Sequence, residues 1–174
     1  MSVKKRQRAT IKTALAKERL RQSYRPDRVR VLFVGEAPPA SGRFFYQADS
    51  GLYRAVRDTF IRAFPTVSHQ GFLESFRDRG FYLVDLCGRP VDRLDRRRRN
   101  KICRDGEDRL SRILNQYRPS AVITLVRSIE ANVRRAKLQA DWSGRSVELP
   151  YPGRWQRHRL IFERKLIAFL RRSQ

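Results

Sequence analysis

Residues that can carry out acid–base chemistry follow stretches of the sequence that are typical of buried strands. Residues 35–39 (Gly-Glu-Ala-Pro-Pro) come after the first such stretch, residues 85–90 (Asp-Leu-Cys-Gly-Arg-Pro) end the second, and residues 150–154 (Pro-Tyr-Pro-Gly-Arg) come after the fourth. A carboxylate such as Glu36 can orient or deprotonate a water molecule, and Asp85 can accept hydrogen bonds. Prolines and glycines restrict these loops, as a preorganised pocket requires. The pattern predicts a rigid pocket that contains acidic groups.

The alternation of apolar runs with helical patterns predicts the elements that position these loops. Strands are expected at residues 29–34, 81–87, 121–126 and 147–149, and helices at about 52–64, 72–79, 110–117, 128–138 and 160–170. Strands separated by helices pair in parallel through right-handed crossovers. The expected fold is therefore α/β, a three-layer α/β/α sandwich with a central four-stranded, mainly parallel sheet. Sites in such sheets form outside the carboxyl ends of the strands, where the motifs lie.

The charge balance indicates the class of partner. The 174 residues include 40 Lys and Arg against 17 Asp and Glu, which gives a formal net charge of +23. A domain this basic repels itself unless a polyanion is nearby, and nucleic acid fits because each neutralised phosphate releases counterions. An acidic protein or an anionic membrane surface fits less well. No stretch is apolar for long enough to cross a bilayer, so we expect DNA as the partner and no membrane.

The chain divides into a basic N-terminal segment, residues 1–28, and an α/β domain, residues 29–174. The N-terminal segment is either a helix that is loosely attached or orders on DNA, or a solvated tail. Cys87 and Cys103 are the only cysteines, too few for a disulfide scaffold, and no export signal is recognisable. We expect reduced thiols, a monomer, and a cytoplasmic location, on the nucleoid if the source is bacterial.

The motifs and their order resemble those of the uracil-DNA glycosylase superfamily, in the branch that usually carries an iron–sulfur cluster. Residues 35–38 look like the first active-site motif of that branch, and residues 42–45 (Gly-Arg-Phe-Phe), followed by Ser-Gly-Leu at 50–52, resemble its next segment. Its second motif, an Asn followed by a Cys and an Arg-Pro pair, is similar to residues 85–90. Its last motif, His-Pro and a small residue, is similar to residues 151–153. The resemblance runs from about residue 31 to the C-terminus.

The resemblance implies a role for each matching residue. An extruded nucleotide would enter the pocket, where Phe45 stacks on the base and Asp85 contacts its edge. Glu36 would stabilise the cation-like sugar and orient or deprotonate a water molecule. The backbone N–H groups near Ala37 and the Tyr151 hydroxyl would stabilise the departing base. Arginines near the predicted site would contact the DNA backbone: Arg43, Arg89, Arg96, Arg97, Arg98, Arg99 and Arg154.

Each of these residues also has a purely structural interpretation. Glu36 could cap a turn or pair with Arg43, and Asp85 could cap the loop that follows its strand. Tyr151 could be a packing aromatic, and one or two of the three aromatic residues at 44–46 are expected only to fill the core. The run of arginines at 96–99 is typical of a loop, which is either solvated or in contact with phosphates.

Departures from the family pattern leave two functions open. Asp85 stands where the family has Asn, and because a carboxylate only accepts hydrogen bonds, it favours a base that presents donors. Tyr151 stands where the family has His and cannot become cationic. No Cys precedes Cys87, and two thiolates cannot hold a cluster that takes four ligands, so no cofactor is expected. We expect hydrolysis of the N-glycosidic bond of uracil or another deaminated base in DNA; the alternative is a catalytically inactive nucleic-acid-binding protein of the same fold.

Overall fold

A four-stranded parallel sheet forms the centre of the computed structural model, which describes residues 3–172, with side chains from residue 13 onward. The strand order is β2-β1-β3-β4. The strands are β1 (Val31–Gly35), β2 (Phe81–Asp85), β3 (Ala121–Thr124) and β4 (Arg145–Glu148). The register pairs Gly35 with Asp85, Val34 with Thr124, and Thr124 with Glu148. The carboxyl ends of all four strands therefore lie level at one edge of the sheet.

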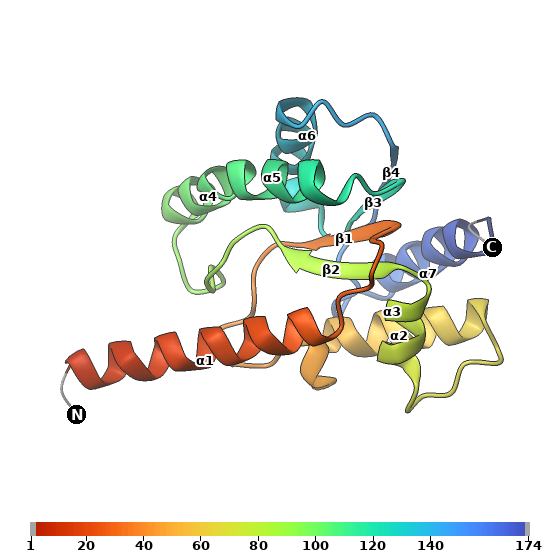
Figure 1. Ribbon diagram of the computed structural model, residues 1–174, viewed down its shortest axis with the longest axis horizontal. Helices are drawn as coiled ribbons and strands as arrows, with labels where there is room; N and C mark the ends of the chain where they lie inside the picture. The colour runs from red at the N-terminus through yellow and green to blue at the C-terminus, as the bar shows by residue number, and fades with distance from the viewer. Residues whose placement is uncertain (1–2, 173–174) are drawn as a thin grey trace.

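Helices cover both faces of the sheet (Figure 1). In that view α4, α5 and α6 lie above the sheet, and α1, α2, α3 and α7 lie below it. The helices are α1 (Val3–Ser23), α2 (Gly51–Ala63), α3 (Phe72–Asp78), α4 (Arg96–Asp105), α5 (Glu107–Tyr117), α6 (Glu130–Gln139) and α7 (Gln156–Arg171), with short 3₁₀ turns at Phe45–Gln47 and Arg127–Ile129. The expected three-layer α/β/α sandwich is confirmed. No helix among residues 3–172 is both long and apolar enough to span a membrane.

Aromatic rings fill the layer between the sheet and helices α2 and α3. Phe33 contacts Phe76 with ring centroids 5.1 Å apart, and Phe60 contacts Phe72 at 5.3 Å. Tilted and edge-to-face pairs of this kind contribute about 0.5–1.5 kcal/mol each beyond their buried area. Phe45 joins the cluster through Phe72 and Phe76, which anchors the loop between β1 and α2.

The arginine run after β2 is helical, whereas the sequence indicated a loop. Asp95 caps α4, because its carboxylate accepts a hydrogen bond from the Arg98 backbone N–H at 3.0 Å. Arginine is a good helix former, and Ile102 and Cys103 in the second half of α4 pack against the core. The four arginines carry no apolar periodicity, so the helical pattern is not visible where the helix begins.

Side chains occupy the free edge of β2. The Tyr46 hydroxyl accepts a hydrogen bond from the Leu83 N–H at 2.8 Å and donates one to the Leu83 carbonyl at 3.1 Å. Arg109 donates from Nη1 to the Asp85 carbonyl at 2.6 Å. The contact of Tyr46 with β2 also fixes the 3₁₀ turn that contains Phe45.

Candidate active site

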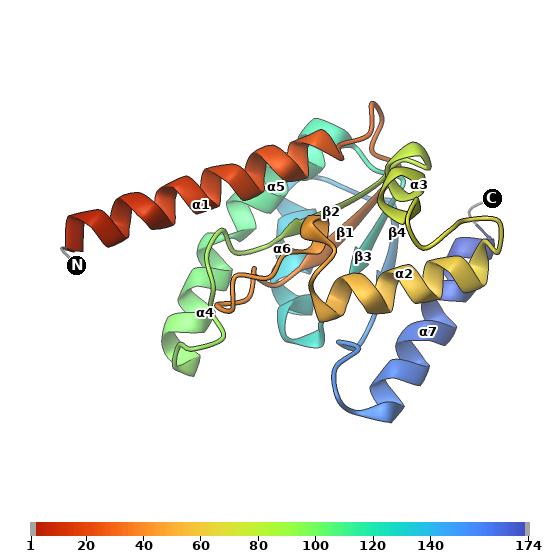
Figure 2. The ribbon, with the colours of Figure 1, turned by 90° about the horizontal axis from the view of Figure 1, so that it is seen from below.

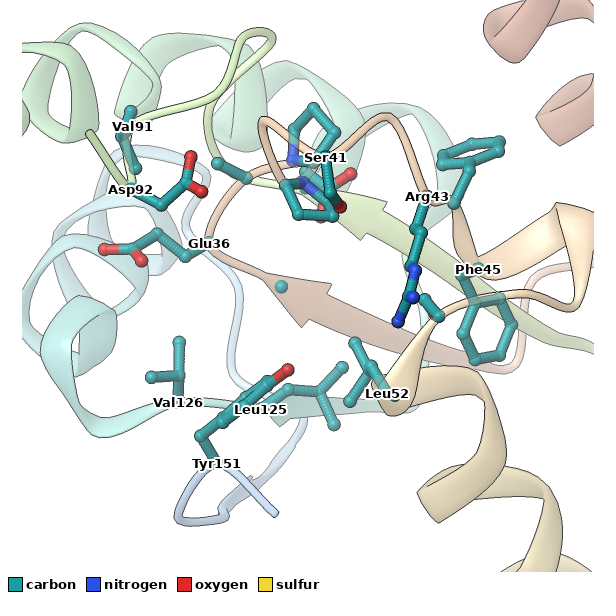
Figure 3. Close-up of a pocket in the computed structure, with 18 of the residues that line it drawn as sticks. Glu36, Ser41, Arg43, Phe45, Leu52, Val91, Asp92, Leu125, Val126 and Tyr151 are labelled. Carbon is teal, nitrogen blue, oxygen red and sulfur yellow. The ribbon is translucent and has the colours of Figure 1, made fainter. Parts of the chain in front are cut away.

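A cavity of about 570 Å³ opens at the edge where the strands end. Its wall is formed by the loops that follow the four strands, together with the start of α2 (Figure 3). Ser50 caps α2 by accepting a hydrogen bond from the Tyr53 N–H at 3.0 Å. This bond fixes the point at which the loop after β1 ends and α2 begins. A cavity of this size is in the range of ligand-binding pockets.

Most of the site residues expected from the sequence meet in this cavity. In Figure 3, Glu36 lies at one end, Phe45 at the other, and Tyr151 between them. The lining includes Glu36, Ala37, Arg43, Phe45, Asp85, Arg99 and Tyr151. The remaining candidates are exposed and do not line it: Arg89, Arg96, Arg97, Arg98 and Arg154.

Hydrogen bonds hold the Glu36 carboxylate in one orientation. Arg99 donates two of them, from Nε to Oε1 at 2.8 Å and from Nη2 to Oε2 at 2.5 Å. The Ser128 hydroxyl donates to Oε1 at 3.3 Å, and the side chain of Glu36 is only 17% exposed. Such a bidentate pair fixes the carboxylate and offsets its charge. The partner of Glu36 is thus Arg99, which follows β2, and not Arg43 in its own loop.

Asp85 lies buried at the end of β2, directly opposite Gly35 of β1. A Cβ atom on residue 35 would lie 2.8 Å from Asp85 Oδ1, so the approach of this carboxylate requires glycine. The other oxygen, Oδ2, lies 3.3 Å from Arg21 Nη2. Burial raises the pKa of the Asp85 carboxyl, and the positive charges of Arg21 and then Arg109 oppose this rise. The pocket wall therefore contains a buried carboxyl group whose charge is balanced by Arg21 and Arg109, two residues that do not line the cavity.

Phe45 is held in the pocket wall by other aromatic rings. The residue is only 4% exposed, and its ring meets Tyr53 and Phe72 edge-to-face at 5.8 and 6.2 Å. Phe44 and Tyr46 are buried as well, so all three aromatic residues of this segment belong to the core. The ring of Phe45 reaches the cavity from a fixed position.

The loop after β4 carries two exposed aromatic side chains, of which Tyr151 lines the cavity. Tyr151 is 47% exposed and Trp155 is 66% exposed. The Arg154 guanidinium lies 5.8 Å from the centre of the Trp155 ring. Tyr151 lines the cavity, whereas the histidine that follows in the chain, His158, lies in α7 and is not part of the cavity wall. An exposed indole beside a cation suits stacking on unpaired bases. Trp155 is not among the site residues predicted from the sequence, although its position next to the last motif is a usable signal.

The two cysteines do not fit an iron–sulfur cluster. Cys87 and Cys103 are buried, with their sulfur atoms 3.5 Å apart, and burial raises the pKa of both thiols. A cluster takes four ligands, and the whole sequence contains two cysteines. Among residues 3–172, no group of three or more His, Cys, Asp or Glu side chains could hold a metal ion. The pair instead packs behind Glu36, with Cys103 Sγ 3.9 Å from Oε1.

Helix α1 contributes residues that the sequence analysis did not identify. Arg21 is 7% exposed and lies over the ring of Phe44 at 5.4 Å while it pairs with Asp85. Lys17 lies over the same ring at 5.6 Å and donates to the Gly42 carbonyl at 2.5 Å. No local signal distinguishes these two residues from the other cations of α1. The contacts of Arg21 and Lys17 arise only from the way α1 packs on the domain.

The parallel sheet, with its pocket at the carboxyl edge, defines an α/β protein with a site at the strand ends. The chain belongs to the Uracil DNA glycosylase superfamily, whose family profile matches residues 22–170. This match confirms the resemblance to the superfamily that the motifs indicated. No individual curated protein matches the chain. Members of the superfamily act on DNA, which makes DNA the class of partner that the match supports. Helix α1 lies almost wholly outside the matched residues.

Proposed function

We propose that the protein is a DNA N-glycosylase that hydrolyses the bond between a deaminated base and its deoxyribose. The observation that carries the proposal is the shared cavity, because an acid (Glu36), an aromatic ring (Phe45) and a second carboxyl (Asp85) line it together. Membership of the Uracil DNA glycosylase superfamily supports this chemistry. Such enzymes take the target base out of the stack and into a pocket.

Cleavage develops positive charge on the sugar and negative charge on the departing base. The carboxylate of Glu36, oriented by Arg99 and Ser128, would stabilise the sugar cation. It would also orient the attacking water, whose oxygen bonds to the anomeric carbon while its proton is taken up by the carboxylate. The N–H of Ala37 and the hydroxyl of Tyr151 would stabilise the anion of the base.

The arginines around the cavity would divide into two groups. The exposed ones would bind phosphates and so position the strand: Arg43, Arg89, Arg96, Arg97, Arg98 and Arg154. Arg99 makes a bidentate pair with Glu36, so we assign it mainly to orienting the acid.

A second candidate is a binding protein that has kept the fold without the activity. Two observations favour it. Both oxygens of Glu36 are engaged by Arg99, and Tyr151 lines the pocket where the family has a histidine. In this case the pocket would hold an extruded base without cleaving its bond.

A cleavage panel separates the two functions. Single-stranded oligonucleotides that contain uracil, hypoxanthine or xanthine are incubated with the protein, and abasic sites are revealed as alkali-labile breaks. We expect cleavage, faster for xanthine than for uracil, because xanthine presents two ring N–H donors to the acceptor oxygens of Asp85, whereas uracil and hypoxanthine each present one beside a carbonyl. The Asp85→Asn variant supplies a donor as well and should shift the preference toward uracil. Tight binding with no breaks on any substrate would favour the non-catalytic protein.

A further inference from the structure

Helix α1 projects beyond the edge of the sheet at which the pocket opens. In Figures 1 and 2, its N-terminal half extends past the ends of β1 and β2, on the same side of the molecule as α4. The C-terminal half of α1 is docked on the domain, and the N-terminal half reaches outward as an arm. The carboxyl edge is therefore flanked by α4 on one face of the sheet and by α1 on the other, and α4 contributes Arg99 to the pocket wall.

Both helices are strongly basic. Residues 3–23 include eight Lys or Arg and a single acidic residue, Glu18. Helix α4 includes six Lys or Arg and one Asp, and its first three arginines are exposed. Two helices of this charge raise the local concentration of a polyanion between them.

The docked half of α1 fixes the direction of the arm. Lys17 donates a hydrogen bond to the carbonyl of Gly42, and Arg21 pairs with the buried Asp85. Tyr24, the residue directly after the helix, stacks on Tyr46 with ring centroids 5.6 Å apart. These contacts tie the arm to the loop that carries Phe45. A strand held by the arm is thus held at a set position relative to the pocket.

We propose that α1 is a nucleic-acid-binding arm, and that a strand with a nucleotide in the pocket is held between α1 and α4. The proposal rests on the pocket receiving a nucleotide, as proposed above, but not on cleavage of any bond. The partner is recognised by its phosphates. A membrane surface fits α1 less well, because residues 3–23 contain no aromatic residue and their leucines do not form a broad apolar face.

The test compares two charge variants of the full chain. In the arm variant, five cations are replaced by Gln: Lys4, Lys5, Arg6, Arg8 and Lys12. In the control variant, five exposed arginines elsewhere are replaced: Arg25, Arg28, Arg164, Arg171 and Arg172. The first two of these precede β1, at the opposite edge of the sheet, and the last three lie on α7 and at its end. Both variants lose the same net charge. Affinity is measured by fluorescence anisotropy with an unmodified single-stranded oligonucleotide over a series of salt concentrations.

We expect the arm variant to bind at least about tenfold more weakly. The slope of the logarithm of the binding constant against the logarithm of the salt concentration should become shallower by about 0.7 for each phosphate of the single strand that the arm no longer neutralises. The control variant should bind almost as tightly as the wild-type protein. Equal weakening in the two variants would show that net charge alone matters and would overturn the arm. The proposal that α1 binds nucleic acid is also overturned if the arm variant binds DNA normally but no longer binds vesicles of anionic lipid. Since the oligonucleotide contains no cleavable base, a failure of the glycosylase activity leaves this result unaffected.

Discussion

Replacing Glu36 with Gln is expected to reduce base excision by about 10²–10⁴-fold, the usual contribution of a positioned general base. The amide keeps the size of the side chain and can still accept one hydrogen bond from Arg99, so the pocket keeps its shape. It can neither take up a proton nor offset a developing positive charge. Single-turnover cleavage of the best substrate in the panel measures the effect, and anisotropy with the same oligonucleotide should show unchanged affinity.

Glu163→Gln is the matched control. Glu163 also pairs with an arginine, Arg62, but this pair joins α2 and α7 on the surface, away from the cavity. Excision by the control should equal that of the wild-type protein. If Glu36→Gln cleaves as fast as Glu163→Gln, Glu36 is not the catalytic base, and its ion pair with Arg99 has only a structural role.

Replacing Arg21 with Met is expected to destabilise the protein by about 3–5 kcal/mol, the typical result of removing one partner from a buried ion pair. The side chains of Arg21 and Asp85 are 9% and 10% exposed, so water does not replace the missing charge. Urea unfolding followed by far-UV circular dichroism measures the difference. The Arg21→Met/Asp85→Asn double variant should recover much of the stability, because no unpaired buried charge remains; Glu18, which also pairs with Arg21, has a side chain that is 45% exposed. The double variant keeps the test informative if the single variant does not fold.

The destabilisation should depend on pH with a defined sign. Burial raises the pKa of Asp85 above its ordinary value of 3.8, so the folded protein binds a proton there more readily than the unfolded chain. Loss of the Arg21 charge, which opposes this rise, raises the Asp85 pKa further in the variant. The loss of stability in Arg21→Met is therefore full at pH values above the pKa of Asp85 in the folded variant, and it shrinks as the pH falls through that pKa toward the pKa in the wild-type protein. If the loss in free energy of unfolding is the same throughout this pH range, its cause is the missing packing of Arg21 over Phe44 and not the missing charge.

The strands and the edge at which the site forms could be predicted from the sequence, because both depend on local patterns. Runs such as residues 121–126 are apolar and β-branched, and the motif loops follow directly in the chain. The ion pairs of the site could not be predicted. Arg99 reaches Glu36 across 63 positions and Arg21 reaches Asp85 across 64, and each is one of many arginines. Which arginine pairs with which acid is decided by how α4 and α1 pack on the sheet.

The capped edge of β2 limits how the protein can associate with other chains. The main-chain groups of Leu83 and the carbonyl of Asp85, which a further strand would need, are already taken by Tyr46 and Arg109. At the other edge, β4 is four residues long, and its exposed residues include Arg145 and Glu148. Short or charged outer strands discourage edge-to-edge pairing. Extended peptides should therefore not add to this sheet, and copies of the chain that assemble on one DNA molecule should do so through side-chain surfaces without forming a continuous sheet.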